Sequence, residues 1–243
     1  MSPNSAANHI RRIVIVAGGT GGLGRAVALA FLKEGDTVAV PYRNEAEFAA
    51  LKSQANEAAA ALHGQQVDVT NEASVKQFID GVVAQQGHVH ALVNTVGGYI
   101  GGSKLWELSD ADLERMLTLN LRSGFVLARA AVRVMLRQGS GCLVNVAARA
   151  ALEPPAGASA YAASKAAAVA MIDSLAADLR GTGVRANSIL PSIIDTEANR
   201  KAMPDADFSR WPKPEDIARV VLFLCSDEAA LIHGAAIPVY GNT

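Results

Sequence analysis

The sequence has little of what marks a secreted, membrane-bound or nucleic-acid-binding protein. Two cysteines occur in 243 residues, and both Cys142 and Cys225 stand in apolar runs, which favours buried thiols over a disulfide framework. The formal net charge is −1 without a basic stripe, so nucleic acid is not expected as a partner. Charged residues interrupt the long apolar stretches, so no membrane span is expected either.

The N-terminal segment lacks the long apolar run of a secretory signal. We expect residues 1–12 to form a flexible tail and the protein to be cytoplasmic. Residues 13–243 are expected to form a single domain. Half of the whole sequence is hydrophobic and 19% is charged, a composition that suits a well-buried core.

Strand-like and helix-like patterns alternate along this domain. Short apolar or β-branched runs predict strands at Ile13–Ala17, Thr37–Val40, Gln65–Val69, Ala91–Asn94, Cys142–Val146, Arg185–Leu190 and Ala236–Tyr240. Helical patterns lie near Leu23–Glu34, Asn44–Leu62, Ser74–Gln86, Asp110–Gln138, Ala160–Arg180 and Pro214–Cys225. Ser109 is expected to cap the fourth helix and Gly181 to end the fifth.

This alternation predicts the α/β fold class. We expect a single-domain, doubly wound (Rossmann) parallel sheet with helices on both faces. In such a sheet, ligands bind at the carboxyl ends of the strands. The loops that follow the strands are therefore where functional residues are expected.

A glycine-rich turn, Gly18-Gly19-Thr20-Gly21-Gly22-Leu23-Gly24, directly follows the first expected strand and opens a helix. Glycines let the backbone approach a pyrophosphate closely, and a helix N-terminus favours its negative charge. The alternative is an ordinary strand-to-helix connection, which the position after the first strand disfavours. We predict dinucleotide binding by Gly18, Thr20, Gly21, Gly22, Leu23 and Gly24.

The end of the second strand bears on the choice of cofactor. NAD sites commonly place an acid there to hold the ribose 2′-hydroxyl, whereas this chain has Tyr42-Arg43. An arginine pairs well with a 2′-phosphate. NADP(H) is therefore the expected cofactor and NAD(H) the less favoured one. The alternative is that Arg43 is an ordinary surface residue of a loop.

Tyr161 and Lys165 are four residues apart in an expected helix, which places the phenol and the ammonium on one face. A free tyrosine has a pKa of about 10 and exchanges protons poorly at neutral pH. A neighbouring cation favours the phenolate and lowers that pKa. The pair predicts a proton-donating tyrosine assisted by a lysine. The alternative is a packed ring beside a solvated amine.

These features, in this order, resemble the short-chain dehydrogenase/reductase family over about residues 13–241. The glycine-rich turn fits that family, as do Tyr161 and Lys165 as its catalytic pair. Further matches are Asp68 in Asp-Val-Thr, Asn94-Thr95-Val96-Gly97 after the fourth strand, Asn120 in a helix, and Pro191-Ser192-Ile193-Ile194-Asp195-Thr196.

The resemblance implies a role for each matched residue. Asp68, with Val69 beside it, is implied to contact the adenine ring. Asn120 is implied to help hold a proton-relay water beside the lysine. The remaining implied cofactor contacts are Asn94, Gly97, Pro191, Ile194 and Thr196.

The family's catalytic serine is absent, because Ala148 occupies its place. Among nearby hydroxyls, Ser192 is the one substitute worth considering. Ser159 and Ser164 are assigned instead to the start and the surface of their helix.

Three segments resemble the quinonoid dihydropteridine reductases, members of the same family that also lack the serine. They are residues 97–102, 147–152 and 195–211. This resemblance implies hydride delivery to a conjugated pterin ring, with Tyr161 supplying a proton. No alkoxide then develops on a tetrahedral carbon, so a second hydrogen-bond donor matters less.

Three functions remain open at this point. The first is an NADPH-dependent reductase of a pterin-like or similarly conjugated small molecule. The second is a carbonyl or alcohol oxidoreductase, and the third is a catalytically silent NADP(H)-binding regulatory protein. No metal site is expected, since His88 and His90 lack a third ligand at suitable spacing. The family resemblance implies a homodimer or homotetramer formed through residues 110–138 and 160–180.

Overall fold

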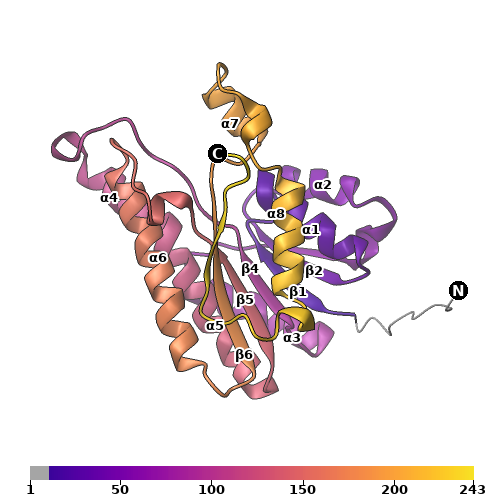
Figure 1. Ribbon diagram of the computed structural model, residues 1–243. Coiled ribbons are helices and arrows are strands. Elements are labelled where there is room, and N and C mark those ends of the chain that lie inside the picture. The colour runs from indigo at the N-terminus through magenta and orange to yellow at the C-terminus, as the bar shows by residue number, and fades with distance from the viewer. Residues whose placement is uncertain (1–10) are drawn as a thin grey trace, which may run out of the picture.

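The computed structural model describes residues 11–243, and most of the predicted N-terminal tail, residues 1–10, lies outside this range. Within it, one sheet of seven parallel strands has the order β3-β2-β1-β4-β5-β6-β7 (Figure 1). The strands are β1 Ile13–Ala17, β2 Thr37–Tyr42, β3 Leu62–Gln66, β4 Ala91–Asn94, β5 Gly141–Val146, β6 Val184–Pro191 and β7 Ala236–Val239. The strand order reverses between β1 and β4, which is where such sheets bind ligands.

Helices cover both faces of the sheet, as expected. They are α1 Gly22–Lys33, α2 Glu45–Gln54, α3 Glu72–Gln86, α4 Asp110–Leu117, α5 Ser123–Gln138, α6 Ser159–Asp178, α7 Glu197–Ala202 and α8 Pro214–Leu224. One core cluster joins the sheet to α1, α2 and α8, and another joins it to α3, α5 and α6. The doubly wound α/β fold is confirmed.

The central strand β1 explains why both layers form. All five of its residues are buried, with Ile13 and Ile15 in one core cluster and Val14 and Val16 in the other. Burying each such side chain contributes about 1.5–3 kcal/mol. A strand covered on both faces therefore reads as a continuous apolar run rather than an alternating one.

The third strand lies earlier than predicted, at Leu62–Gln66 instead of Gln65–Val69. Leu62 pairs with Val38 and Gln66 with Tyr42 at the edge of the sheet, where four of the five residues of β3 are exposed. An edge strand of this kind carries no apolar signal. The helix predicted over residues 44–62 accordingly ends at Gln54, and a 3-10 helix at Asn56–Ala61 leads into the strand.

The helix predicted over residues 110–138 is divided in the structure. Ser109 caps α4 as expected, its hydroxyl oxygen accepting from the backbone N–H of Asp112. A π-helical segment at Thr118–Arg122 then separates α4 from α5. Similarly, α6 ends at Asp178, shortly before the predicted stop at Gly181. A short helix, α7, also forms within residues 195–211, where no helix is predicted from the sequence.

Candidate active site

The expected functional residues gather at the carboxyl ends of the central strands. The loops after β1, β2, β3, β4 and β6 carry the residues expected to bind the dinucleotide. Helix α6 supplies Tyr161 and Lys165, and α7 follows β6 at the same end of the sheet (Figure 1). Parallel strands bring these ends together, so residues distant in sequence meet at one edge.

Steric contacts explain the glycines of the turn after β1. A Cβ on Gly24 would lie 2.0 Å from the carbonyl oxygen of Gly18, and a Cβ on Gly18 would lie 2.6 Å from Thr95 Oγ1. Gly18 also has a φ of +80°, which favours glycine. A Cβ on Gly22 would lie 2.8 Å from Thr196 Cγ2, so the turn also packs against the segment after β6.

The turn delivers the N-terminus of α1 into the site. Gly21 is the N-cap, and the first turn of α1 contains no acidic residue. The positive end of the helix dipole is therefore not neutralised by a side chain of that turn. Leu23 points into the core, so it can reach a ligand only through its backbone.

The residue predicted to bind the ribose phosphate follows β2, and those predicted to contact the adenine ring follow β3. Arg43 is exposed, and its carbonyl accepts from Gln66 Nε2 at 3.0 Å. Asp68 is exposed as well, and hydrogen bonds from Thr70 lower its pKa, with Arg43 contributing by its charge. Val69 is buried in the core, which leaves only its backbone for a cofactor contact.

Buried side-chain amides hold the segment that follows β4. Asn94 Nδ2 donates to Asn145 Oδ1 at 2.9 Å, and Asn94 Oδ1 accepts from the backbone N–H of Val96 at 3.2 Å. The Asn94 side chain therefore serves to hold the loop in position. At Gly97, a Cβ would lie 2.9 Å from both Asn120 Oδ1 and Lys165 Nζ, so this glycine leaves room between the loop and two predicted catalytic groups.

Tyr161 and Lys165 lie on α6 as predicted. Lys165 is buried, and its Nζ donates to the carbonyl of Val146 at 3.1 Å. Tyr161 is partly buried and meets the Tyr99 ring edge-on, with 4.9 Å between ring centroids. The pair thus occupies the space between β5 and the 97–102 loop.

The pKa of Tyr161 shifts in the direction opposite to the one expected. Burial raises it to about 12, with a further contribution from Tyr99. Burial also lowers the pKa of Lys165 to about 8. The expectation of a lowered phenol pKa is wrong for the chain's own groups, because desolvation of the phenol prevails. At neutral pH Tyr161 is a phenol, which is the form that donates a proton.

Asn120 lies in the π-helical segment and joins three elements. Its Oδ1 accepts from the N–H of Gly98, while its Nδ2 donates to the carbonyl of Gly98 and to Ser164 Oγ at 3.0 Å. Ser164 in turn donates to the carbonyl of Tyr161 at 2.7 Å. Ser164 is fully buried, so its predicted place on the helix surface is wrong.

Ala148 forms a small buried apolar cluster with Ala150 and Ala162, and Tyr161 packs against this cluster. The suggested substitute, Ser192, donates its hydroxyl to the carbonyl of Tyr240 at 2.7 Å. Since that proton is already engaged in a structural hydrogen bond, Ser192 is a poor replacement for a second donor.

The segment after β6 reaches over the glycine-rich turn. Pro191 is buried at the end of β6, and Ile194 packs against the core of the α1–α8 face. Thr196 caps α7 by accepting from the N–H of Asn199 at 3.2 Å. These contacts set the segment beside Gly22, as a cofactor-covering loop requires.

Two features of the site were missed from the sequence. Tyr99 is 64% exposed and forms one wall beside Tyr161; a Cβ on Gly101 would lie 2.0 Å from its hydroxyl oxygen. A tyrosine between glycine pairs is a signal that could have identified it. Ser164 was assigned to the surface because periodicity does not reveal the hydrogen bond between Asn120 and the helix.

The residues present fit a nicotinamide dinucleotide. The glycine turn leaves the close approach that a pyrophosphate needs, and the exposed Arg43 and Asp68 lie beyond it toward the ribose and adenine end. Tyr161, Lys165 and Gly97 would lie toward the nicotinamide end. A bound cofactor of this class supplies or accepts the hydride.

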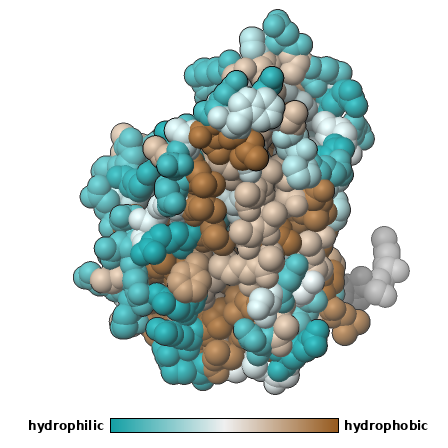
Figure 2. All heavy atoms as spheres, turned by 90° about the vertical axis from the view of Figure 1, so that its left-hand side faces the viewer, coloured by the Kyte–Doolittle hydropathy of each residue, from teal (hydrophilic) through white to brown (hydrophobic). Residues whose placement is uncertain are grey.

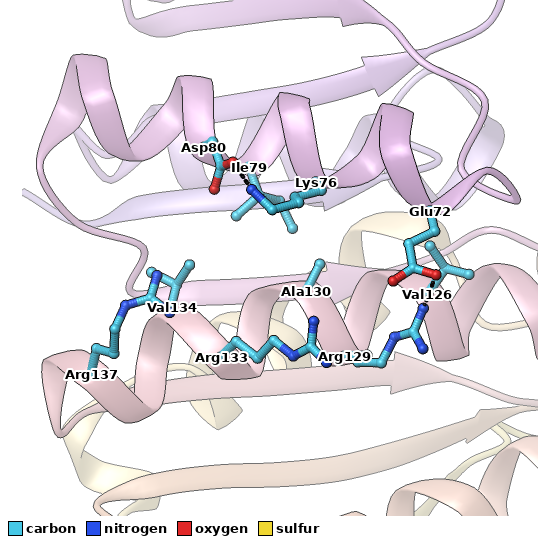
Figure 3. A pocket seen from close by; sticks show the side chains of 10 residues that line it. All are labelled: Glu72, Lys76, Ile79, Asp80, Val126, Arg129, Ala130, Arg133, Val134 and Arg137. Atoms are coloured by element: carbon cyan, nitrogen blue, oxygen red, sulfur yellow. Dashed lines mark hydrogen bonds and ion pairs between the residues drawn. The ribbon is translucent and has the colours of Figure 1, made fainter.

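A separate cavity of about 120 Å³ lies between α3 and α5 (Figure 3). Its charged lining includes the ion pairs Glu72–Arg129 and Lys76–Asp80, and it contains none of the predicted site residues. Among residues 11–243, no group of three His, Cys, Asp or Glu side chains could hold a metal ion. Over the same range, no helix is long and apolar enough to cross a membrane.

Comparisons with known proteins agree with this geometry. The family model for short chain dehydrogenases matches residues 12–207. The 3-oxoacyl-[acyl-carrier-protein] reductase of Thermotoga maritima is 28% identical over 95% of this chain and 97% of its own. The D-threitol dehydrogenase of Mycolicibacterium smegmatis is 34% identical, over 95% and 92%.

A solved short-chain type dehydrogenase/reductase from Mycobacterium ulcerans superposes with a TM-score of 0.90 at 28% identity, covering 95% of this chain and 89% of that one. These matches span nearly the whole described domain, including the glycine-rich turn, Tyr161 and Lys165. The chain is a member of the short-chain dehydrogenase/reductase family, and thus an oxidoreductase that uses a nicotinamide cofactor.

Proposed function

We propose that this protein is an NADPH-preferring reductase of a planar, conjugated small molecule such as a quinonoid dihydropteridine. The observation that carries the proposal is that Tyr161 packs against the apolar cluster that contains Ala148. A site with a partly buried phenol and a methyl group in place of a second hydroxyl suits a substrate that develops no alkoxide. The exposed Arg43 supports NADPH, because no acid occupies the end of β2.

The state of Tyr161 supports reduction as the working direction. A phenol with a pKa of about 12 keeps its proton at neutral pH and is ready to donate it. In this reaction the ring gains a hydride from the cofactor and one proton from the Tyr161 hydroxyl, a two-electron reduction. Lys165 and Asn120 hold the surrounding loop and helix in place, and Tyr99 offers an aromatic wall for a flat substrate.

Tyr161→Phe tests this role. Turnover of a quinonoid dihydropterin with NADPH should fall at least about 100-fold, because general acid catalysis contributes about that much or more. The dissociation constant for NADPH, measured by its fluorescence on binding, should change less than about twofold, since the ring remains. Wild-type turnover in the variant would remove Tyr161 from the mechanism.

A second candidate is a carbonyl or alcohol oxidoreductase, favoured by the relatives, which include a D-threitol dehydrogenase. In that case Ala148→Ser should raise carbonyl reduction about tenfold or more, because a donor is restored where the oxyanion develops. Parallel assays with a panel of ketones and with the dihydropterin would separate the two. Lack of any gain would favour the conjugated substrate.

We also propose a homodimer or homotetramer formed through residues 110–138 and 160–180. Figure 2 faces this side of the molecule, where apolar side chains form a band between hydrophilic flanks. Phe125 and Leu136, which belong to α5, are 44% and 45% exposed. Sedimentation velocity would measure the mass of the assembly.

A further inference from the structure

The glycine-rich turn is hydrogen-bonded to a carboxylate that the strand-end rule does not reveal. Thr20 Oγ1, in the glycine-rich turn, donates to Glu47 Oε2 at 2.9 Å. Glu47 belongs to the first turn of α2, which follows β2 and Arg43. A residue 27 positions away in sequence is thereby joined to the turn that would hold the dinucleotide.

The position of Glu47 is set by a helix cap. The Asn44 side chain caps α2, its Oδ1 accepting from the backbone N–H groups of Ala46 at 2.9 Å and Glu47 at 3.4 Å. Thr20 is held on its other side, since its carbonyl accepts from Arg25 at 3.1 Å. The hydrogen bond between Thr20 and Glu47 thus joins two anchored backbone segments.

A second acid repeats this arrangement on the same helical turn. The Tyr42 hydroxyl donates to Glu45, which raises the pKa of Tyr42, and the Tyr42 ring stacks on Phe48 at 4.7 Å. The Thr20 and Tyr42 hydroxyls therefore both already donate to carboxylates. Neither is free to donate to a phosphate without giving up its present partner.

Arg43 alone favours NADP(H), but the net charge of the residues around it does not. Arg43 contributes one positive charge, and Glu45 and Glu47 contribute two negative ones, so the three sum to −1. A phosphate monoester carries about −1.5 to −2 at pH 7 and is repelled by carboxylates. A ribose 2′-hydroxyl, by contrast, is a donor that a carboxylate accepts well.

We propose that Glu47 is a specificity-determining residue of the cofactor site. Glu47 opposes the 2′-phosphate that Arg43 attracts, and it accepts a hydrogen bond from the ribose of NADH. The protein therefore binds both cofactors and prefers NADPH only narrowly. This inference rests on the proposed function only in requiring that a nicotinamide cofactor binds here.

The test measures cofactor binding rather than turnover. The dissociation constants of NADPH and NADH are determined for the full chain by fluorescence titration, for wild type and for Glu47→Gln. Loss of one surface charge next to a phosphate should tighten NADPH binding by about two- to fivefold. NADH binding should stay equal or weaken, because the amide is a poorer acceptor for the ribose hydroxyl.

Two further variants make the test specific. Glu34→Gln removes the same charge at the far end of α1, which is an exposed position, and should leave both constants unchanged. Arg43→Gln should weaken NADPH binding at least about tenfold and leave NADH unaffected, since an ion pair with the phosphate is lost. Thermal melting of each variant checks that the fold is retained.

The outcomes separate this inference from the proposed function. The inference is overturned if Glu47→Gln changes both constants equally, changes neither, or behaves like Glu34→Gln. An unaltered NADPH constant in Arg43→Gln would instead overturn the NADPH preference of the proposed function, whatever Glu47→Gln shows. None of these readouts depends on Tyr161 or on the identity of the substrate.

Discussion

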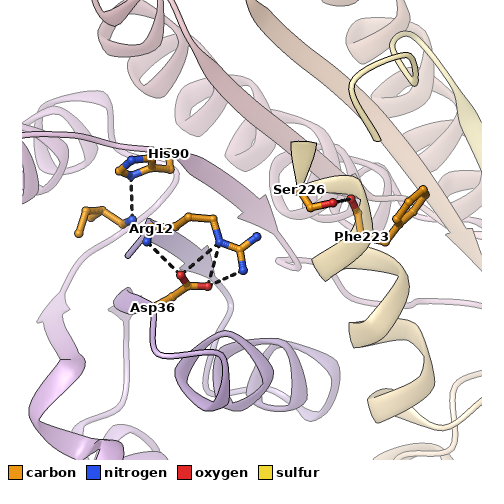
Figure 4. Close-up of polar contacts among 6 residues, drawn as sticks. Arg12, Asp36, His90, Phe223 and Ser226 are labelled. Carbon is orange, nitrogen blue, oxygen red and sulfur yellow. Dashed lines mark hydrogen bonds and ion pairs between the residues drawn. The ribbon is translucent and has the colours of Figure 1, made fainter. Parts of the chain in front are cut away.

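The two ends of strands β1, β2 and β4 differ in how their polar groups are used. At their amino ends, Arg12 is bonded to Asp36, and His90 is bonded to the adjoining backbone of Ile13 (Figure 4). At their carboxyl ends the same strands lead into the glycine-rich turn, into Arg43 and into the loop at Gly97. One end holds its charges in contacts within the chain, whereas the other presents backbone and charge to a ligand.

The amino end is a bonded network around one buried carboxylate. Asp36 is fully buried and accepts from the backbone N–H of Arg12 at 2.9 Å and from its guanidinium at 2.6 Å. The Arg12 guanidinium also lies 5.2 Å from the centre of the Phe31 ring. His90 Nδ1 accepts from the backbone N–H of Ile13 at 2.8 Å. This end therefore contributes to stability and has no evident role in chemistry.

The comparison teaches where mutations should act. Changes at the carboxyl ends should alter ligand binding, and changes at the amino ends should alter the free energy of unfolding. The same kind of substitution should thus have different consequences at the two ends of one strand. The predictions below test that separation, beginning with the largest effect.

Gly24→Ala should nearly abolish cofactor binding. The new Cβ would lie 2.0 Å from the Gly18 carbonyl oxygen and 2.6 Å from Thr95 Oγ1, so the turn has to move. We expect NADPH affinity to fall at least about 100-fold, because a displaced turn loses several backbone contacts to the pyrophosphate at about 1.5 kcal/mol or more each. Isothermal titration calorimetry measures this loss.

Two other glycines provide matched controls for that substitution. Gly21 lies in the same turn, where a Cβ would be 3.4 Å from the nearest atom, so Gly21→Ala should keep most of the affinity. Gly81 lies inside α3 with nothing near it, and Gly81→Ala should stabilise the protein by about 0.5–1 kcal/mol. Equal loss of affinity in all three variants would mean that sterics at Gly24 do not govern binding.

Asp36→Asn should destabilise the fold by about 2–4 kcal/mol, because it leaves the Arg12 guanidinium without its buried counter-charge. The dissociation constant for NADPH should change less than about twofold, since the change lies at the opposite end of β1 and β2. Urea denaturation and fluorescence titration report the two quantities. In the double variant with Arg12→Met, part of the lost stability should return. A cofactor-binding defect in either variant would contradict the separation of stability at the amino ends from ligand binding at the carboxyl ends.

The fold was predictable because its signals are local and repeated. Buried central strands such as β1 are continuous apolar runs, and the glycine-rich turn marks the first ligand-binding loop. The bounds of the edge strand β3 were predicted wrongly, since its exposed residues are placed by pairing with β2 rather than by their own hydrophobicity. The break between α4 and α5 was not predicted either, because π-helical hydrogen bonding leaves no periodic pattern in the sequence.

The candidate site likewise divides into features with a local sequence signal and features that depend on tertiary contacts. Spacing alone placed Tyr161 and Lys165 on one helix, but spacing carries no information about burial, which sets the direction of the Tyr161 pKa. Ser164 and Glu47 act through partners 44 and 27 positions away, and no local pattern contains such pairs. Residues proposed to contact a ligand could thus be identified from motifs, whereas residues proposed to position or oppose it required the fold.

The smallest predicted effect is a pH dependence of stability that originates at the amino end. Burial lowers the pKa of His90 to about 4, with the charge of His88 contributing, whereas an unfolded histidine titrates near 6.5. The unfolded state therefore binds the proton first as the pH falls. The stability from neutral His90 is complete above pH 6.5 and is lost between pH 6.5 and 4. Because His90 is partly exposed, the loss should be on the order of 1 kcal/mol.

His90→Asn isolates this contribution, because its side-chain oxygen can still accept from the Ile13 N–H but takes up no proton in this range. Urea denaturation at pH 7.5 and 5 should show a smaller stability difference in the variant than in the wild type. NADPH affinity at pH 7.5 should be the same in both proteins. An identical pH dependence would assign the acid sensitivity to other groups, and an altered affinity would mean that the two ends of β4 are coupled rather than separate.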